Sequence, residues 1–224
     1  MRGTLLNLLE NLTHEVEFPG PIYEFGAYRV PGQRHLPHVR SYFGEKSFVG
    51  CDLRFGPGVD EVQDLHELAL EDASVGTALL FDTIEHVRNP WRAMSELHRV
   101  LKPGGLLVMT SVWYFPIHAY PDDYWRFTAS AFRSLFERLE TVSVAMCGIR
   151  RLPHTVVGVA SKGPLPPEVA GSIDRTVQTW RDRGSRTWKE SVLDLAPPLL
   201  LVYGYHWFLT GMDRIDRALG RDEP

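Results

Sequence analysis

The segment from Gly76 to Thr110 constrains the fold most strongly, because it holds two apolar runs with a helical pattern between them. The runs cover residues 78–81 and 106–109, and short, wholly apolar runs are typical of strands buried on both faces. The Lys-Pro-Gly-Gly sequence at 102–105 ends the helix, because proline cannot continue it and glycine permits a left-handed turn. Two buried strands joined by a helix predict a parallel βαβ unit. The apolar face of the helix is predicted to consist of Trp91, Met94, Leu97, Val100 and Leu101.

The same segment resembles the class I S-adenosylmethionine-dependent methyltransferases, and within them the small-molecule subgroup called type 11. The resemblance is carried by Asp82 at the end of a strand, Glu-His-Val at 85–87, and Arg-Val-Leu-Lys-Pro-Gly-Gly at 99–105. The last of these is the most specific, and the resemblance extends over residues 20–160. It implies an α/β fold with a Rossmann-like, doubly wound, seven-stranded and mostly parallel sheet. It also implies S-adenosylmethionine as the cofactor.

The resemblance ends after two apolar runs, 142–145 and 155–160, which predict a final antiparallel pair of strands. We therefore expect residues 1–160 to form the S-adenosylmethionine-binding methyltransferase domain, with an amphipathic helix at its N-terminus. Residues 161–224 are expected to form a helical extension that acts as a lid, packs on the core or forms a homodimer surface. The apolar stretch 192–209 within this extension is interrupted by Asp and Pro and is too short to span a bilayer.

Composition and charge argue against several classes of protein. The net charge of −4 disfavours a nucleic-acid partner, because neutralising phosphates requires clustered Lys and Arg. Cys51 and Cys147 give neither a disulfide framework nor a zinc pattern, which favours a cytoplasmic location. His35 and His38 flank a proline, lack an evident third ligand, and are expected to be surface residues. The resemblance to the small-molecule subgroup implies a small-molecule acceptor as the partner, and no transmembrane segment is predicted.

The first strand is expected at Ile22–Gly26, with Glu24 near its carboxyl end. In the resembled family this strand leads into an acidic turn with three glycines at alternate positions. Here Gly26 occupies the first glycine position, whereas Tyr28 and Val30 occupy the other two. These side chains would obstruct the pyrophosphate of a nicotinamide dinucleotide, whereas S-adenosylmethionine has no phosphate. The turn therefore argues against a nicotinamide cofactor, and taken alone it also fits an ordinary turn after a strand.

Acidic residues follow the next predicted strands as well. Phe48–Asp52 is expected to be the second strand, and an acid at its end can accept hydrogen bonds from both ribose hydroxyls. A solvated aspartate is the alternative. Val62–Leu68 is expected to be a short third strand with Asp64 at its exit, and the resemblance implies that Asp64 and Leu65 bind the adenine ring. The predicted cofactor-binding residues are Glu24, Gly26, Tyr28, Asp52, Leu53, Asp64, Leu65 and Asp82.

The loop after the fifth predicted strand, residues 111–128, is the most unusual part of the sequence. It contains seven aromatic residues together with His118, two aspartates and Arg126. A loop that leaves a parallel strand points toward the ligand site of such a sheet, and aromatic faces with a few polar groups line small-molecule sites. We therefore expect the acceptor to bind here; closure of one core edge by the aromatics is the alternative. The predicted substrate-binding residues are Trp113, Tyr114, Tyr124 and Arg126.

Two histidines are candidates for the general base that a hydroxyl acceptor needs. His118 in the aromatic loop is preferred, and His86, just past the fourth strand, is the other candidate. The sequence around His86 is similar to a stretch of quinone-biosynthesis O-methyltransferases, in which acidic and histidine groups can hold a divalent cation. The resemblance implies that Asp82, Glu85 and His86 could do the same. A histidine that caps the next helix is the alternative, and no metal ligand is assigned.

Three functions from different classes follow. The first is methyl transfer from S-adenosylmethionine to a small molecule, expected at a hydroxyl of a sugar, phenol or secondary metabolite. The second is a non-catalytic Rossmann-like binding or partner protein that has lost cofactor affinity, which Tyr28 and Val30 suggest. The third, a nicotinamide-dependent oxidoreductase, is disfavoured because the glycine turn is missing.

Overall fold

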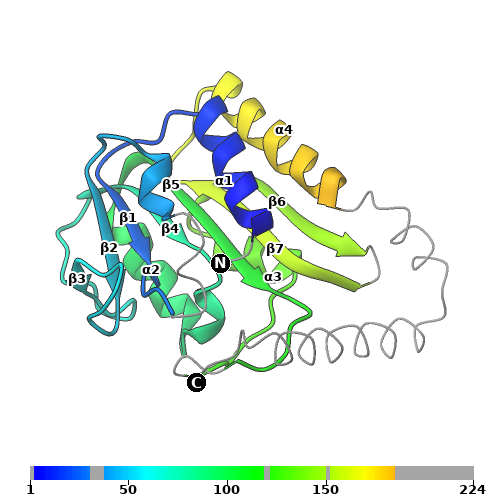
Figure 1. The fold of residues 1–224 in the computed structure, drawn as a ribbon. Helices are drawn as coiled ribbons and strands as arrows, with labels where there is room; N and C mark the ends of the chain where they lie inside the picture. The colour runs from blue at the N-terminus through cyan, green and yellow to red at the C-terminus, as the bar shows by residue number, and fades with distance from the viewer. Residues whose placement is uncertain (1–2, 31–37, 119–121, 150–151, 185–224) are drawn as a thin grey trace.

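The computed structural model describes residues 3–30, 38–118, 122–149 and 152–184. Within them, seven strands form one sheet in the order β3-β2-β1-β4-β5-β7-β6 (Figure 1). The strands are β1 (Ile22–Phe25), β2 (Phe48–Asp52), β3 (Glu61–Val62), β4 (Val75–Leu80), β5 (Leu101–Val112), β6 (Glu140–Ile149) and β7 (Leu152–Ser161). The helices are α1 (Gly3–Glu15), α2 (Pro90–Val100), α3 (Ala129–Leu135) and α4 (Pro167–Gly184), with short 3-10 helices η2 (Val39–Tyr42) and η3 (Ile84–His86).

The pairing of the strands confirms the predicted doubly wound sheet. Strands β1 to β5 pair in parallel, and β7 runs antiparallel between β5 and β6. From β1 the chain builds outward through β2 to β3 and then returns to the other side of β1 with β4. Ligands of such sheets bind where the strand order reverses, outside the carboxyl ends of the strands. The crevice between the ends of β1 and β4 is therefore the expected site.

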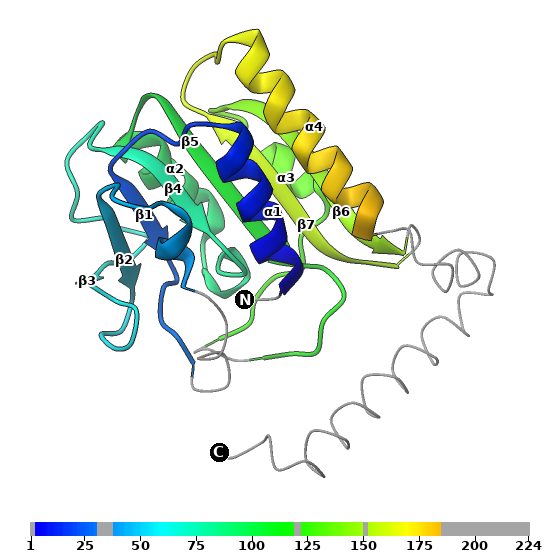
Figure 2. The same cartoon turned by 45° about the horizontal axis from the view of Figure 1, so that its top comes forward.

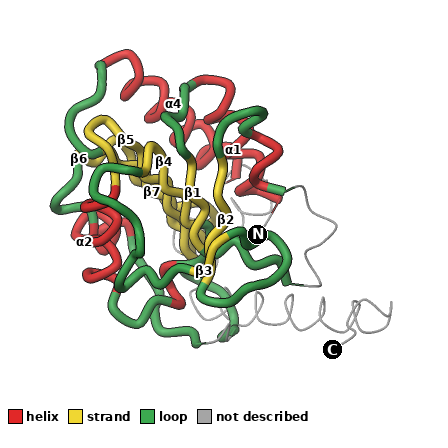
Figure 3. The backbone as a smooth tube through the Cα atoms, turned by 90° about the vertical axis from the view of Figure 1, so that its left-hand side faces the viewer, coloured by secondary structure: helices red, strands yellow, loops and turns green. Residues whose placement is uncertain are grey.

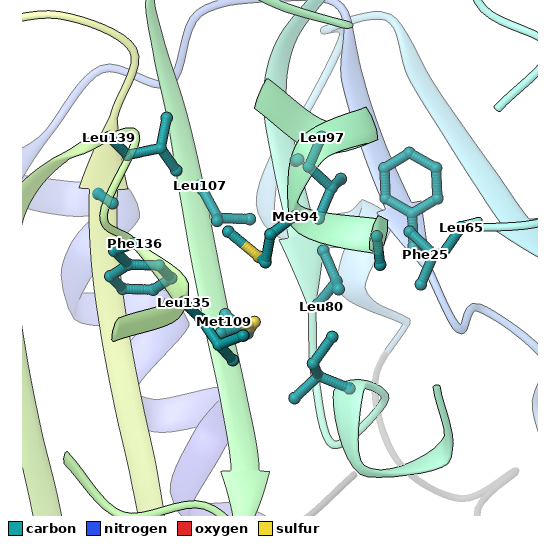
Figure 4. Close-up of a cluster of buried hydrophobic side chains, with 14 of the residues drawn as sticks. Phe25, Leu65, Leu80, Met94, Leu97, Leu107, Met109, Leu135, Phe136 and Leu139 are labelled. Carbon is teal, nitrogen blue, oxygen red and sulfur yellow. The ribbon is translucent and has the colours of Figure 1, made fainter. Parts of the chain in front are cut away.

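The sheet is covered by helices on both faces (Figures 2 and 3). Helices α1 and α4 lie on one face, and α2 and α3 lie on the other. The sheet residues alternate accordingly: Leu79 and Val108 pack with the α1–α4 core, whereas Leu80 and Leu107 pack with the core under α2 and α3. Figure 4 shows this second core, in which Met94 and Leu97 of α2 meet side chains from the strands and from α3. The helix α4 is part of the first core through Ile173, Val177 and Trp180.

Helix α2 shows where the predicted apolar face was wrong. Met94, Leu97 and Val100 are buried as expected, but Trp91 is 51% exposed. Three steps of three residues make nine residues, which is two and a half turns at 3.6 residues per turn, so Trp91 lies on the opposite side from Val100. The Trp91 ring instead packs edge-on against Trp125, with the ring centroids 5.8 Å apart. The helix begins after Asn89, whose side chain accepts the Arg92 N–H.

Two strand boundaries also differ from the prediction. The third strand is only Glu61–Val62, so Asp64 lies beyond it, in an isolated bridge with Glu67 that closes a turn. The Asp64 carboxylate accepts the His66 backbone N–H at 2.8 Å, and this local bond competes with strand pairing. The fifth strand begins already at Leu101 and contains the predicted 102–105 turn, with a register shift against β4 that accommodates it. The apolar stretch 192–209 lies outside the described residues.

Candidate functional site

A cavity of about 300 Å³ lies at the carboxyl ends of β1, β2 and β4. All eight residues that the sequence assigned to the cofactor line it, and both candidate histidines do so as well. The site is therefore where the topology requires it, although the individual roles stay predictions. Among its lining residues are Glu24, Gly26, Tyr28, Asp52, Leu53, Asp64, Leu65, Asp82, His86 and His118.

Glu24 and Gly26 form the exit of β1. Glu24 is 6% exposed, and burial raises the pKa of its carboxyl to about 8, so it holds a proton at neutral pH. Gly26 has φ +87°, and a Cβ there would come within 2.2 Å of the Thr83 hydroxyl. That hydroxyl donates to the carbonyl of Phe25 at 3.1 Å, so the bond connects the end of β1 to the segment that follows β4. Only glycine fits this turn without displacing Thr83.

The glycine-poor turn after Gly26 is accommodated by the loop that follows β2. The Tyr28 ring packs on this loop, where a Cβ on Gly56 would come within 2.3 Å of the ring. The Arg54 guanidinium lies over the same ring, 4.8 Å from its centroid. The backbone N–H of Arg29 donates to the carbonyl of Pro57 at 2.8 Å. Tyr28, at the second glycine position, therefore has room for its ring because the facing loop carries a glycine, Gly56, at the point of contact.

Asp52 ends β2 as predicted and is half-buried at the cavity. Its carboxylate accepts the backbone N–H groups of Tyr28 and Arg54, each at 3.3 Å. These long bonds tie together the segments that follow β1 and β2. The position and chemistry suit recognition of paired hydroxyls, which require an acceptor at the end of this strand.

The wall beyond β2 holds Asp64, Leu65 and a residue that sequence reasoning left unassigned, His66. Asp64 accepts both the backbone N–H and the ring Nδ1–H of His66, the latter at 2.7 Å. The opposite ring nitrogen, Nε2, accepts the Asn89 N–H at 3.1 Å. Both ring nitrogens of His66 are thereby engaged, so this histidine shapes the wall and is not available as a base. The Asp-Leu-His spacing, which permits such a turn, is the signal that could have indicated this role.

Asp82 sits at the exit of β4 in a conformation that few non-glycine residues adopt, with φ +48°. Its N–H donates to the Thr110 hydroxyl at 3.1 Å, and that hydroxyl donates in turn to the Asp82 carboxylate at 3.2 Å. The neighbouring strand β5, which carries Thr110, holds Asp82 at the cavity. Left-handed backbone at such a position is often found at functional sites.

The two candidate histidines lie together, with ring centroids 4.8 Å apart in an edge-to-face arrangement. The Nδ1 of His86 bonds the carbonyl of Asp122, and the Nδ1 of His118 bonds the carbonyl of Pro116 at 3.1 Å and lies 3.2 Å from the Asp123 carboxylate. Burial lowers the pKa of His86, which favours its neutral form. The sequence proposed these residues as rival bases, and the structure places them side by side.

The aromatic loop is tied to the segment 84–87 by its backbone. The N–H of Tyr124 donates to the carbonyl of Glu85 at 2.9 Å, and the Trp125 indole N–H donates to the carbonyl of Val87 at 2.9 Å. Arg126 forms a two-pronged ion pair with Asp123, whose side chain is 1% exposed. The hydrogen bonds from Arg126 outweigh burial and lower the pKa of Asp123 to about 2.

This anchoring changes which loop residues face the cavity. Phe115 and His118 line it, whereas the four predicted substrate residues do not. Arg126 is occupied by Asp123 and by the carbonyls of Phe115 and Pro116, and the Tyr124 hydroxyl donates to Asp122. Because these contacts depend on the folded path of the loop, the sequence offered no signal that singled out Phe115. Contact of an acceptor with Trp113, Tyr114, Tyr124 or Arg126 stays a prediction.

Residues 45–109, which include strands β2 to β4, α2 and most of β5, match the family described as a methyltransferase domain, type 11. Over these residues the chain is similar to the S-adenosylmethionine-dependent methyltransferases of type 11, the family that the sequence motifs indicated. An uncharacterized methyltransferase of Mycolicibacterium gilvum is 34% identical over 99 residues, which are 42% of this chain and 33% of that protein. The chain covers only 20 to 38% of the length of the curated relatives it matches.

Solved structures share the fold of this chain. The Burkholderia thailandensis 1,6-didemethyltoxoflavin-N1-methyltransferase, solved with 1,6-didemethyltoxoflavin and S-adenosylhomocysteine, superposes with a TM-score of 0.56. It is 16% identical and the match covers 72% of this chain and 79% of that one. The [4+2]-cyclase SpnF superposes with a TM-score of 0.54 at 14% identity, covering 71% and 81% of the two chains. No helix in the described part of the chain is long and apolar enough to cross a membrane.

S-adenosylmethionine is the cofactor of this family, and the residues of the cavity fit it. Gly26 lines the cavity without a side chain, so a cofactor can approach the backbone of this turn, and Thr83 fills the space that a Cβ would need. Asp52, Asp64 and Asp82 line the same cavity, and their carboxylates suit a positively charged ligand.

Proposed function

We propose that this chain transfers the methyl group of S-adenosylmethionine to a hydroxyl of a small-molecule acceptor. One observation carries the proposal: a single cavity holds the predicted cofactor residues and opens onto His86, His118 and Phe115. A methyl donor and its acceptor must meet in line, so they need adjoining parts of one enclosed site. A phenol, a sugar or another hydroxylated metabolite of modest size suits the mixture of aromatic and polar lining.

The cofactor half is assigned by chemistry. Asp52 accepts the ribose hydroxyls, Asp64 and Leu65 contact the adenine, and Leu53 covers the ring from its exposed position beside Asp52. Glu24 binds the amino group of the methionine portion, and Gly26 gives that portion access to the backbone. Bound S-adenosylmethionine supplies a methyl group on a positively charged sulfur. The chain's part is to hold that methyl group in line with the acceptor.

The acceptor half supplies a base. The contacts of the His118 Nδ1 with the Pro116 carbonyl and the Asp123 carboxylate place a proton on Nδ1 and leave Nε2 as the acceptor nitrogen. Arg126 fixes Asp123, so the base is oriented by a second residue that is itself held. We assign His118 as the group that takes the proton from the acceptor hydroxyl. His86 is the second candidate, with the same Nδ1-donating arrangement toward Asp122.

The rival function is a binding protein that has lost its cofactor, which Tyr28 and Val30 suggested because they replace two glycines of the turn. The Tyr28 ring packs on Gly56 and Arg54 of the loop after β2, so it does not need the space inside the turn, and the argument for this function is weaker. The existence of a [4+2]-cyclase with the same fold means that the fold alone does not determine the reaction.

A reducing compartment is supported by two buried cysteines, Cys51 and Cys147, neither of which is in a disulfide.

Calorimetry with S-adenosylmethionine and S-adenosylhomocysteine tests the first half of the proposal, with Asp52→Ala as the variant in which binding should weaken. A screen of hydroxylated and amine acceptors with methyl-labelled cofactor tests the second half. Label in a methyl ether supports the assignment. Label only in amines would move the reaction to nitrogen, and absence of cofactor binding in the folded wild-type chain would favour the binding-protein function.

A further inference from the structure

Glu85, His86 and His118 converge beside the cavity in a way that methyl transfer does not require. One potential ligand atom from each lies within 4.8 Å of the other two. Glu85 is fully buried, and the two histidines are partly buried. Within the described residues, this is the set of His, Cys, Asp and Glu side chains that meets the geometry of a metal site. The three residues come from η3 and from the aromatic loop, which are far apart in sequence.

The hydrogen bonds of the two histidines prepare them as ligands. A carbonyl oxygen can only accept, so the contacts of His86 with Asp122 and of His118 with Pro116 place the ring proton on Nδ1 in both. The lone pair is then on Nε2. Metal-bound histidines almost always donate their other ring N–H to a carbonyl or carboxylate, which fixes the ring and raises its basicity. Asp123, 3.2 Å from the His118 ring, provides the carboxylate version of this support.

The carboxylate of Glu85 is positioned in the same manner. The Ser111 hydroxyl donates to Glu85 Oε2 at 2.9 Å, and the Glu85 carbonyl accepts the N–H groups of Tyr124 and Trp125. These bonds tie the residue that carries the carboxylate to the loop that carries His118.

We propose that Glu85, His86 and His118 bind a divalent transition-metal ion of the zinc class. Two imidazoles and one carboxylate suit Zn²⁺, Co²⁺ or Fe²⁺, whereas Mg²⁺ and Ca²⁺ prefer oxygen ligands throughout. The set differs from the Asp82, Glu85 and His86 set that the sequence suggested, because His118 replaces Asp82, whose carboxylate accepts the Thr110 hydroxyl.

The geometry leaves room for such an ion. Ligand atoms of a tetrahedral zinc site with bonds of about 2.0–2.1 Å lie about 3.4 Å apart, so the cluster needs to close by about 1.4 Å or less. Three protein ligands leave a fourth position open, as in catalytic zinc sites, and His86 and His118 line the cavity in which the acceptor is proposed to bind.

The metal and the general base compete for the same lone pair on His118. With an ion bound, His118 would be a ligand, and the ion would supply a Lewis acid that lowers the pKa of an acceptor hydroxyl at the open position, so that its proton could leave to solvent. Without it, His118 is the base. This consequence rests on the proposed methyl transfer, whereas metal binding itself rests only on the cluster. The two can therefore fail separately.

The test measures metal binding to the chain without cofactor. The protein is stripped with chelator, equilibrated with Zn²⁺ alone, dialysed and analysed for bound metal, and Co²⁺ is added in parallel to detect a tetrahedral absorption spectrum. We expect one ion per chain. His86→Ala and His118→Ala should each lower zinc affinity by more than about 100-fold, and Asp123→Asn, which acts on a ligand from outside, by about 10- to 100-fold.

His98→Ala is the matched control, because His98 lies on α2 outside the cavity lining, and it should bind zinc as the wild type does. Circular dichroism on each variant establishes that the fold persists, and S-adenosylmethionine calorimetry on His118→Ala establishes that the cofactor half persists. A wild-type chain that retains no metal overturns the proposal. So does equal zinc binding by the wild type and a folded His86→Ala/His118→Ala double variant. Cofactor binding that fails while zinc still binds would instead refute the methyltransferase assignment.

Discussion

The two halves of the cavity are built in different ways. The cofactor half is formed where β1, β2 and β4 end, so the register of the sheet places Glu24, Asp52 and Asp82 at one edge. The acceptor half is formed by a loop without helix or strand, held by bonds from Tyr124 and Trp125 to η3. A parallel sheet determines where its strand ends meet, whereas a loop can be placed only by its own contacts. The residues of the cofactor half can therefore be predicted from the sequence, whereas those of the acceptor half cannot.

The halves also differ in charge. Acidic side chains surround the cofactor half, in keeping with a positively charged ligand. In the acceptor half the Asp123 carboxylate is neutralised by Arg126, and the two histidines supply groups that can take up a proton. This contrast predicts that mutations in one half change affinity for the cofactor, and that mutations in the other change turnover.

The largest effect is expected at His118. The variant His118→Ala should lower turnover by about 10² to 10⁴, the usual contribution of a general base, and leave S-adenosylmethionine affinity within about twofold. Single-turnover transfer of labelled methyl and cofactor calorimetry measure the two quantities on the same preparation. His98→Ala is the control. If His118→Ala retains full turnover, the role of base moves to His86.

The variant His86→Ala sharpens this contrast. Burial lowers the pKa of His86, and its ring lies between the loop and the exit of β4. Its loss is expected to lower turnover and to disturb cofactor affinity together, because the carbonyl of Asp122 loses its donor. Full turnover in both histidine variants would show that positioning alone carries the reaction, as it can when the acceptor is already deprotonated.

The next effect is expected at Asp52. Asp52→Ala should weaken S-adenosylmethionine binding by about 1.5–3 kcal/mol, the value of hydrogen bonds to a charged group, with turnover at saturating cofactor little changed. Asp52→Asn keeps one acceptor oxygen and should lose less. Calorimetry on both variants gives the affinities. A folded Asp52→Ala chain with wild-type affinity would remove Asp52 from the ribose site and break the proposed division between the halves.

A smaller effect concerns the pH dependence of cofactor binding through Glu24. Its pKa is raised by burial to about 8, so the free chain holds a proton there at neutral pH. Binding of the cofactor's positively charged amino group must expel that proton, so affinity should rise with pH, by at most about tenfold per unit below pH 8. The α-amino group of the ligand itself loses its charge near pH 7.7–8.0, so the rise in affinity should end above that pH.

Calorimetry in buffers of different ionisation enthalpy counts the released proton. Glu24→Gln should release none and show a flat profile. For stability the sign is opposite: the folded pKa exceeds the usual 4.5, so Glu24 contributes stability that is present below pH 4.5 and lost as pH rises to 8. Proton release by the Glu24→Gln variant equal to that of the wild type would assign the proton to another group.

The features that were predicted correctly from the sequence are those decided by a local pattern of residues. The boundaries of β2 and the acid at its end are correct to the residue, because an apolar run bounded by Asp52 has one sensible placement. The final antiparallel pair is also confirmed, since it is decided by local pattern. All of these depend on residues close in the chain.

The parts that sequence reasoning missed depend on distant contacts. Whether Asp64 ends a strand was decided by its bond to His66, and whether Trp91 is buried was decided by helical phase and by Trp125. The pairing of His86 with His118 needs the loop to return from β5 to η3. No spacing in the sequence reports such a return, because the loop follows hydrogen bonds to carbonyl groups that every residue carries.

The smallest effect is expected where the cofactor half departs from its family, at Tyr28. If the ring packs on the loop after β2 and leaves the turn free, Tyr28→Ala should change S-adenosylmethionine affinity by less than about threefold. It should lower the unfolding free energy by about 0.5–1 kcal/mol through the lost contact with Arg54.

The contact between the ring and the loop is tested by a second variant. Gly56→Ala should lower the unfolding free energy by about 1–3 kcal/mol, because its Cβ would come within 2.3 Å of the Tyr28 ring. The double variant removes that collision, so it should be more stable than the sum of the single changes predicts. Denaturant unfolding of the four chains measures this coupling. Additive effects would show that ring and loop are not in contact. A tenfold gain in cofactor affinity on Tyr28→Ala would show that the ring does obstruct the turn, and would favour a binding protein that has lost its cofactor.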